Sequence, residues 1–434
     1  MKKVLTGLIP LILFLSQDGL ANPFTTEKWV TKNGVPVVFY PAMEVPMLDI
    51  NLAFAAGSAY DGAHYGLSAL TAHLLNQGSA GQDATAIAES LADKGAQFST
   101  ETSKDMVVFN LRTLSRQDAL EQSIKTFSQI INHPDFPEES FNREKKQLLM
   151  TIEQAKESPD EIANLNLFKS MYPNHPYAHA VNGTSTSLER LTKDEVTHFY
   201  KRYYNAENAL LVLVGAIDSP SAHQLAEMIT KELPKGQHAA LIPKARPLAK
   251  ATDITIPFPS SQTVIRLGQI GIDHHNPDYF PLMVGNYILG GGSLVSRLAV
   301  EVREKKGLTY GITSELVPMS GEGPFIIGFS TKNEQASKAL TITKDTLQKF
   351  LVEGPSQKEL EAAKLYITGS FPLSLASNRA IANLLLRMTF YNLPEEFLTT
   401  YVAKINAVTT KEIKEAFKKQ VNSKALSLVK VGSS

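Results

Sequence analysis

Residues 290–310 read GGGSLVSRLAVEVREKKGLTY and form the most specific pattern in the chain. A glycine triplet on its own also serves as a plain flexible turn, because glycine adopts backbone conformations that other residues avoid. Here the triplet is followed at fixed spacing by Ser296-Arg297-Leu298 and then by Glu301 to Tyr310. This ordered run of residues indicates a structured motif, and a plain linker would not require it.

The chain also repeats part of itself at an offset of 217 residues. Residues 195–215 fall on residues 412–432, so that Glu195 matches Glu412 and Gly215 matches Gly432. Each copy has the pattern of an amphipathic helix, a short turn and an apolar strand that ends in glycine. Because both copies close a segment of about 200 residues, the repeat favours a duplication.

Mixed helix and strand patterns surround both copies and predict an α+β fold. The helical patterns lie at residues 67–77, 84–94, 116–131, 140–157, 193–203, 281–289, 335–351 and 357–370. We expect two homologous α/β-sandwich halves, each with an antiparallel-type sheet packed against helices. Residues 234–250 carry three prolines and no clear periodicity, and we interpret them as a linker. The predicted domains are therefore residues 22–233 and 251–434.

Composition excludes several classes of protein. The 434 residues include 43 basic and 43 acidic ones, so net charge gives no reason to expect a nucleic-acid partner. Cysteine is absent, which excludes disulfides, thiol catalysis and thiolate metal sites. The apolar fraction of 43% is ample for buried cores.

The first 21 residues have the pattern of a signal peptide. Lys2 and Lys3 precede an apolar run from Val4 to Leu15, and a small-x-small cleavage pattern ends at Ala21. The run is shorter than the roughly 20 apolar residues that a membrane-spanning helix needs. A buried N-terminal helix is the alternative, but the pattern favours export, and we expect a periplasmic protein without a membrane span.

A second motif lies at residues 66–79, which read GLSALTAHLLNQGS. It resembles the zinc helix of the pitrilysin-type (inverted-zincin) zinc peptidases, where H-x-x-E-H stands in a context like G-L-x-H-x-x-E-H-x-x-x-x-G-T. In that motif two histidines one turn apart bind zinc, and the glutamate activates the bound water. Here Ala69 and Ala72 replace the first histidine and the glutamate, and only His73 remains.

The third zinc ligand of that family, a glutamate on a later helix, is also missing. Residues 141–152 resemble that helix; Glu144 matches its first acidic residue, but Thr151 stands at the ligand position. Since zinc sites need at least three protein ligands, the resemblance implies that this chain binds no cofactor of its own. Zinc is expected in a partner subunit, and His73 is interpreted as a vestigial helix histidine.

The motif at residues 290–310, by contrast, agrees with the family's second-half signature, G-G-G…S-R-L-x-x-x-[IV]-R-E-x-x-G-L-x-Y. The arginine and tyrosine that hold substrate in the family fall on Arg303 and Tyr310. A guanidinium can bind a peptide carbonyl or carboxylate, and a tyrosine hydroxyl can stabilise an oxyanion. The alternative is a solvated charge and a core aromatic. The resemblance also implies substrate contact by a flexible loop at Gly290, Gly291 and Gly292.

The remaining histidines give no second metal site. His175 and His179 have the spacing of a helical pair, but two prolines beside them argue against a helix. Their segment resembles a structural His-Pro-Tyr…Gly-Thr loop of the same family. His274 and His275 precede Pro277 in a polar loop, and we expect both to be solvated.

These features together predict the non-catalytic, substrate-binding subunit of a heterodimeric zinc peptidase that acts on unstructured peptides in the cell envelope. The resemblance covers residues 25–432 and implies that the chain forms half of a clamshell, active only with a homologous partner that carries H-x-x-E-H. The alternative is a stand-alone pseudo-peptidase that binds peptides as a holdase or scaffold. An independent peptidase built on His73 is disfavoured, because two ligands and the base are missing.

Overall fold

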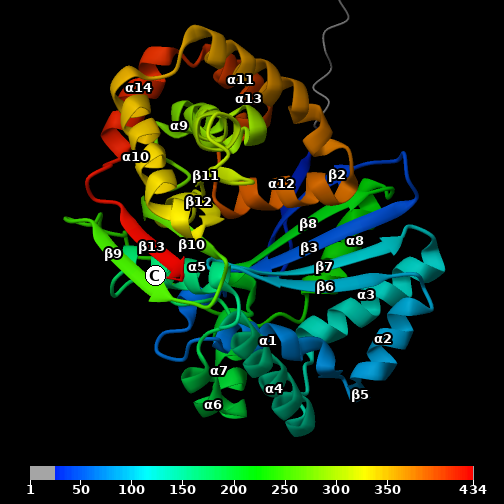
Figure 1. Ribbon diagram of the computed structural model, residues 1–434. Helices are drawn as coiled ribbons and strands as arrows, with labels where there is room; N and C mark the ends of the chain where they lie inside the picture. Colours follow the sequence, from blue (N-terminus) through cyan, green and yellow to red (C-terminus); the bar gives the residue numbers. More distant parts are fainter. Residues whose placement is uncertain (1–24, 434) are drawn as a thin grey trace, which may run out of the picture.

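The computed structural model describes residues 25–433, which form two sheets with helices against both faces of each sheet (Figure 1). Six strands make the first sheet, in the order β1 (Glu27–Val30), β2 (Pro36–Pro41), β8 (Ala209–Gly215), β3 (Met47–Phe54), β7 (Val107–Leu114) and β6 (Gln97–Thr102). Five strands make the second sheet, in the order β9 (Thr252–Pro257), β13 (Ser427–Gly432), β10 (Gln262–Ile270), β12 (Pro324–Lys332) and β11 (Ile312–Leu316).

Apart from β1, the two sheets have the same topology. The order β2-β8-β3-β7-β6 corresponds strand by strand to β9-β13-β10-β12-β11. In each sheet the first of these pairs is parallel, and the other neighbouring pairs are antiparallel. The structure therefore confirms both the predicted α+β class and the two homologous halves.

The sequence repeat ends each half with the same helix and strand. Helix α7 (Lys193–Tyr203) begins with a capping box formed by Thr192 and Glu195, and α14 (Thr410–Gln420) begins with one formed by Thr409 and Glu412. Each box satisfies N–H groups that a helix start leaves without a partner. The strand that follows each helix, β8 or β13, is almost wholly buried, as its apolar sequence requires.

One face of each sheet carries most of the helices of its own half. The first core packs the sheet against α1 (Leu67–Leu74), α2 (Ala84–Ala92), α3 (Gln117–Asn132), α7 and α8 (Ser219–Thr230). Helix α4 (Glu138–Ala155) lies against α1. The second core packs its sheet against α9 (Tyr279–Asn286), α10 (Ala336–Glu353), α11 (Gln357–Ser370), α13 (Phe397–Ala407) and α14.

The opposite face of each sheet is covered by a helix from the other half. Helix α5 (Pro159–Met171), from the first half, packs on β10 and β13 of the second sheet. Helix α12 (Asn378–Phe390), from the second half, packs on β3 and β8 of the first sheet, as Figure 1 shows. The two helices occupy equivalent positions in the repeat. Each half therefore contributes the corresponding helix to the sheet of the other half.

The rest of the described chain consists of short elements and connections. They include β4 (Gly78–Ser79), β5 (Gln82–Asp83), α6 (Ser185–Arg190) and helical turns at Tyr287–Gly291 and Ala299–Glu304. Residues 234–250 contain neither helix nor strand. The domain limits at 22–233 and 251–434 stay predictions, because α5 and α12 cross between the halves.

Two predictions about export and membranes concern different parts of the chain. The predicted signal peptide, residues 1–21, lies outside the described residues. Within residues 25–433, none of the helices combines the length and apolar character needed to cross a bilayer.

Candidate functional site

Helix α1, which carries the degenerate zinc motif, is held at its start by a buried carboxylate. Asp61 accepts hydrogen bonds from the backbone N–H groups of Gly66, at 2.7 Å, and Ser68, at 2.8 Å. Burial raises the pKa of Asp61 to about 7, although these two hydrogen bonds favour the charged form. The position of α1 is therefore fixed by contacts that do not depend on a metal.

A close backbone contact holds the same end of α1. Gly183 has a φ of +77°, and a Cβ atom there would lie 2.2 Å from the carbonyl oxygen of Tyr65. Only glycine permits both this conformation and this approach. The loop that contains His175 and His179 has just one short helical turn, at Pro176–Ala178, so the two histidines do not share a helix face. This loop packs against α1, as a structural role requires.

The positions that correspond to zinc ligands do not form a metal site. Ala69 is 1% exposed and Ala72 is fully buried, so both belong to the packed interior of α1. His73 is half-buried near Glu144 of α4; burial lowers the pKa of its imidazole, and the charge of Glu144 opposes that effect only in part. His73 is therefore a mostly neutral imidazole at pH 7.

Thr151, at the third ligand position, also has a local role. Its hydroxyl donates a hydrogen bond to the carbonyl oxygen of Gln147, 3.1 Å away in the same helix. Among residues 25–433, no three His, Cys, Asp or Glu side chains gather where they could hold a metal ion. One imidazole beside two alanines and a threonine does not fit zinc, which requires at least three protein ligands.

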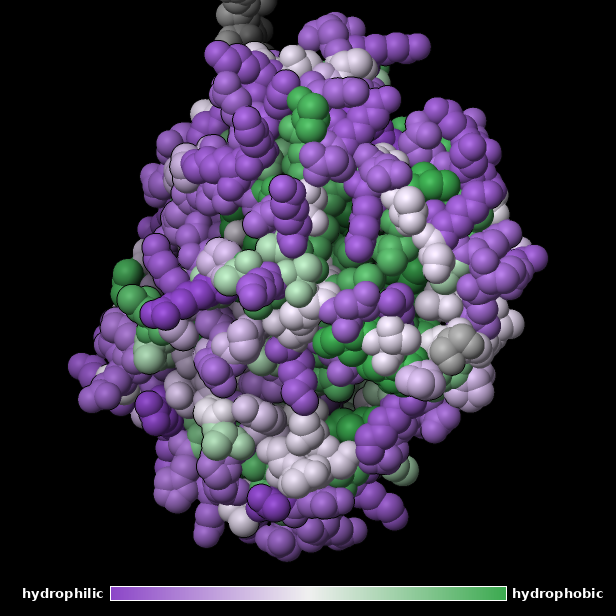
Figure 2. Space-filling view, turned by 60° about the vertical axis from the view of Figure 1, so that its left-hand side comes forward, coloured by the Kyte–Doolittle hydropathy of each residue, from purple (hydrophilic) through white to green (hydrophobic). Residues whose placement is uncertain are grey.

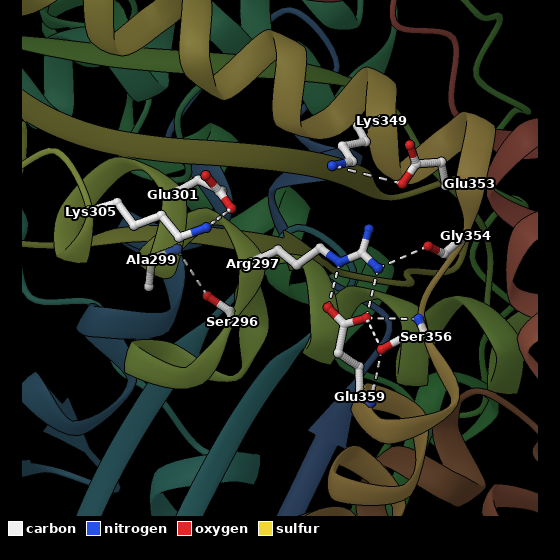
Figure 3. Close-up of polar contacts among 10 residues, drawn as sticks. All are labelled: Ser296, Arg297, Ala299, Glu301, Lys305, Lys349, Glu353, Gly354, Ser356 and Glu359. Carbon is white, nitrogen blue, oxygen red and sulfur yellow. Dashed lines mark hydrogen bonds and ion pairs between the residues drawn. The ribbon is translucent and has the colours of Figure 1, made fainter.

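In the second half, Arg297 of the Ser-Arg-Leu motif is a structural residue (Figure 3). Its guanidinium donates to both carboxylate oxygens of Glu359, at 2.5 and 2.7 Å, and to the carbonyl oxygen of Gly354 at 2.9 Å. Glu359 in turn forms the capping box of α11 with Ser356. Burial alone would raise the pKa of Glu359, but the hydrogen bonds from Arg297 and Ser356 outweigh it and lower the pKa to about 2.

The two predicted substrate-binding residues differ in exposure. Tyr310 is 89% exposed and directly follows two anchored residues: Leu308 is buried, and the hydroxyl of Thr309 lies 2.7 Å from the carbonyl oxygen of Ser330 in β12. Arg303 is half-buried in the helical turn Ala299–Glu304. In the described part of the chain, no hydrogen bond or ion pair engages the side chain of either Arg303 or Tyr310.

Tyr310 stands at the edge of a cavity of about 410 Å³. The cavity lies over the outer strands of the second sheet, with Thr313 of β11 and Gly328 of β12 in its lining. Arg266 also lines it and donates hydrogen bonds to Asp160 and Asn164 of α5. The tyrosine hydroxyl is therefore available to a bound molecule, and the alternative interpretation of Tyr310 as a core aromatic is wrong.

The glycine triplet was expected to form a flexible loop, and the structure shows a helical turn in its place. Gly290 and Gly291 end the turn Tyr287–Gly291 that continues α9. Gly290 is buried, and a Cβ atom there would lie 2.4 Å from the backbone nitrogen of Ser314 in β11. Gly292 is buried as well, whereas Gly291 is exposed. Gly290 thus serves close packing against the sheet.

The prediction for the second histidine pair is half wrong. His275 is exposed, but His274 is half-buried, and its ring stacks on Tyr391 with centroids 3.9 Å apart. Burial, together with the nearby charge of Arg387, lowers the pKa of His274 to about 4. The sequence could not reveal this contact, because Tyr391 lies more than 100 residues away.

Both halves of the chain match known protein families. Residues 42–185 match the family described as insulinase (peptidase family M16). Residues 190–366 match the peptidase M16 inactive domain. The replaced zinc positions, Ala69, Ala72 and Thr151, all lie within the first of these two matches.

Solved structures give the same result. The peptidase M16 inactive domain from Pseudomonas fluorescens is 40% identical, with a TM-score of 0.91, over 94% of this chain and 98% of that one. A protease from Helicobacter pylori, at 20% identity and a TM-score of 0.87, covers 94% of this chain and 99% of its own and shares the fold.

Two curated relatives have informative names. The non-peptidase homolog YmxG of Helicobacter pylori is 26% identical over 96% of this chain and 95% of its own length. The probable mitochondrial-processing peptidase subunit beta of Schizosaccharomyces pombe is 23% identical over 94% of this chain and 91% of its own.

Proposed function

The chain belongs to peptidase family M16, and we propose that it acts there as the non-catalytic, substrate-binding subunit of a heterodimeric zinc peptidase. One observation carries this proposal. The replacements at Ala69, Ala72 and Thr151 remove the metal site, whereas Arg303 and Tyr310 keep the family spacing, and Tyr310 is presented to solvent. Such selective loss is expected when two chains divide the work of one enzyme.

In this proposal the chain's own residues bind and orient the peptide. The hydroxyl of Tyr310 donates a hydrogen bond to the carbonyl oxygen of the scissile peptide as negative charge develops there. The guanidinium of Arg303 binds a neighbouring carbonyl or a carboxylate of the substrate. Zinc and the activated water belong to the partner, because the residues around His73 do not fit a metal.

The relatives support a two-chain assembly. The Schizosaccharomyces pombe protein is by name one subunit of a processing peptidase. We propose that the present chain forms half of a clamshell, with its second half facing the zinc-bearing half of a homologous partner. Unstructured peptides are the proposed substrates, since an extended backbone can reach both Tyr310 and a site on the facing chain.

We place this assembly in the cell envelope. The positive start, apolar run and cleavage pattern of residues 1–21 support export to the periplasm. Expression of a tagged chain that includes these residues, followed by cell fractionation, tests this localisation. A chain that stays in the cytoplasm at full length would contradict it.

The experiment that tests the function combines genetics with reconstitution. The neighbouring genes are searched for a homologue with H-x-x-E-H, and the two chains are co-expressed with a tag on one of them. We expect co-purification, and peptide cleavage by the pair but by neither chain alone. Failure to recover any zinc-motif homologue, or full activity of the zinc-bearing chain alone, would overturn the proposal.

A further inference from the structure

The outer face of the second sheet is only partly covered. Helix α5 packs on β10 and β13 and leaves β11 and most of β12 open on that side, although Ile326 of β12 packs against the same hydrophobic cluster. The side chains of Thr313, Glu315, Ile326 and Ser330 alternate along these two strands and face the open space. This uncovered strip is the floor of the cavity beside Tyr310.

The cavity beside Tyr310 continues into a larger one. The second cavity has a volume of about 960 Å³ and shares Asn164, Glu315 and Ile326 with the first. Its far wall is made by α12 and the segment before it. The space-filling view shows hydrophilic side chains over most of this side of the molecule and hydrophobic ones inside a hollow near the middle of the view (Figure 2). One groove therefore leads from Tyr310 into an interior space between the two halves.

The walls of the larger cavity are mostly aromatic and aliphatic. They include Phe168, Met283, Phe371, Leu384, Phe397 and Tyr401. A concave site of this size with apolar walls and a few polar groups is typical of ligand-binding sites in proteins. Apolar side chains of a ligand would be removed from water there, which favours binding.

A basic side chain, that of Arg387 on α12, stands at this apolar end. Ala380, Asn383, Leu384 and Arg387 lie on the face of α12 that lines the cavity, at the spacing of successive helix turns. Arg387 is exposed to the cavity, and within residues 25–433 its guanidinium makes no ion pair or hydrogen bond. Three other arginines of the chain are paired with acids: Arg112 with Asp49, Arg266 with Asp160 and Arg297 with Glu359.

Two other charged groups around this end, Lys104 and Asp105, are already engaged. Lys104 donates a hydrogen bond to the carbonyl oxygen of His179. Asp105 accepts hydrogen bonds from Tyr177, Tyr391 and the backbone of Ser320. Glu315 lies on the floor where the two cavities meet. Arg387 is therefore the group with free capacity for an anion, and a guanidinium binds a carboxylate with two parallel hydrogen bonds.

We propose that the groove is a second substrate subsite, in which an extended peptide held at Tyr310 runs along β11 and β12 and places an apolar side chain and a carboxylate beside Arg387. This inference rests on the proposed function. It adds a preference for substrates with a hydrophobic residue next to a C-terminal or side-chain carboxylate. The groove lies within one chain, so the subsite needs no residue of the partner.

The test measures peptide binding to the purified chain alone by fluorescence anisotropy. The probe is a fluorescein-labelled peptide that ends in Leu-Phe with a free carboxylate, compared with the same peptide as its amide. We expect the free acid to bind about tenfold more tightly, the difference that one charge-assisted bidentate contact supplies. An amide peptide with an aspartate near its end shows whether a side-chain carboxylate serves equally well.

Variants connect the binding to the cavity. Arg387→Gln should remove the difference between acid and amide, and Arg387→Lys should keep part of it. The matched control is Arg379→Gln. Arg379 is an exposed arginine at the start of the same helix, and it does not line the cavity. Leu384→Trp, which fills the apolar space, should weaken both peptides. Circular dichroism verifies that each variant is folded.

The outcome is independent of the partner subunit. Equal affinity for acid and amide, or an unchanged preference in Arg387→Gln, would overturn the subsite while leaving the heterodimer untouched. If the acid preference depends on Arg387 but no zinc-bearing partner exists, the subsite stands and the proposed subunit role fails.

Discussion

The carboxylate of Asp105, in the turn between β6 and β7, accepts a hydrogen bond at 3.0 Å from the hydroxyl of Tyr391 at the end of α12. The same carboxylate accepts one from the hydroxyl of Tyr177, at 2.5 Å, and one from the backbone N–H of Ser320, at 2.9 Å. Asp105 is 1% exposed. One buried carboxylate thus joins the two halves of the molecule.

Asp105→Ala should therefore destabilise the protein strongly. The substitution leaves the buried hydroxyl of Tyr177, the partly buried hydroxyl of Tyr391 and the N–H of Ser320 without their acceptor, and we expect a loss of about 3 kcal/mol in the free energy of unfolding. Urea denaturation followed by circular dichroism measures it. Asp345→Ala, an exposed change on α10, is the control and should have little effect. Equal stability of the two variants would show that Asp105 does not hold the halves together.

The pair Arg297–Glu359 predicts a pH-dependent contribution to stability. The pKa of Glu359 is lowered from 4.5 to about 2 in the folded protein, so the stabilising effect is complete above pH 4.5 and disappears as the pH falls toward 2. Because Glu359 is 31% exposed, we expect only about 1 kcal/mol at neutral pH.

The measurement is the difference in unfolding free energy between the wild type and Glu359→Gln across this pH range. That difference should shrink below pH 4.5, whereas the difference for Glu361→Gln, an exposed glutamate on the same helix, should stay small throughout. A constant difference for Glu359→Gln would contradict the prediction.

Much of the fold could be predicted from local sequence patterns. Helices with clear apolar periodicity were placed well: α7 and α11 have the predicted bounds, Lys193–Tyr203 and Gln357–Ser370. The repeat at an offset of 217 residues correctly indicated two homologous halves. Helices α5 and α12 were missed, although Ser158 and Ser377 cap them. Their apolar faces meet a sheet of the other half, and no local pattern reveals that exchange.

Residues of the candidate site could be predicted only where they belong to a sequence motif. The spacing of Arg303 and Tyr310 is visible in the sequence, and so is the loss at Ala69 and Ala72. Arg387 belongs to no motif, and its setting depends on β11, β12 and α12 meeting in space. The same is true of Asp105, because its partners Tyr177 and Tyr391 are far away along the chain.

The purified chain should contain no stoichiometric zinc. His73 is the sole remaining ligand of the motif, and a single imidazole does not hold the ion against buffer. His73→Ala should therefore leave the metal content unchanged, and a zinc-bearing family member purified in the same way is the positive control. Mass spectrometry of metals after gel filtration gives the ratio. One zinc per chain, lost in His73→Ala, would mean that His73 has found new ligands.

Tyr310→Phe should lower kcat/KM of the reconstituted pair by about 100-fold, the effect of removing one donor to a developing oxyanion. Arg303→Ala should act mainly through KM if the guanidinium binds the ground state and transition state equally. The control is Tyr366→Phe, another exposed tyrosine of the second half, whose ring stacks on Tyr287. Full activity in Tyr310→Phe would exclude the hydroxyl from catalysis.

The exchange of α5 and α12 predicts that neither half is stable alone. A fragment of residues 25–250 lacks α12, so the apolar side chains that this helix covers, among them Val38, Val108 and Val212, become exposed to water. The fragment 251–434 lacks α5, which covers Val264, Val429 and Val431 in the same way. We expect each fragment to aggregate when expressed alone and the two together to form a soluble complex, assayed by gel filtration and circular dichroism. A soluble, monomeric and fully folded first fragment would show that α12 is dispensable, and the exchanged helices would then not be what holds the halves together.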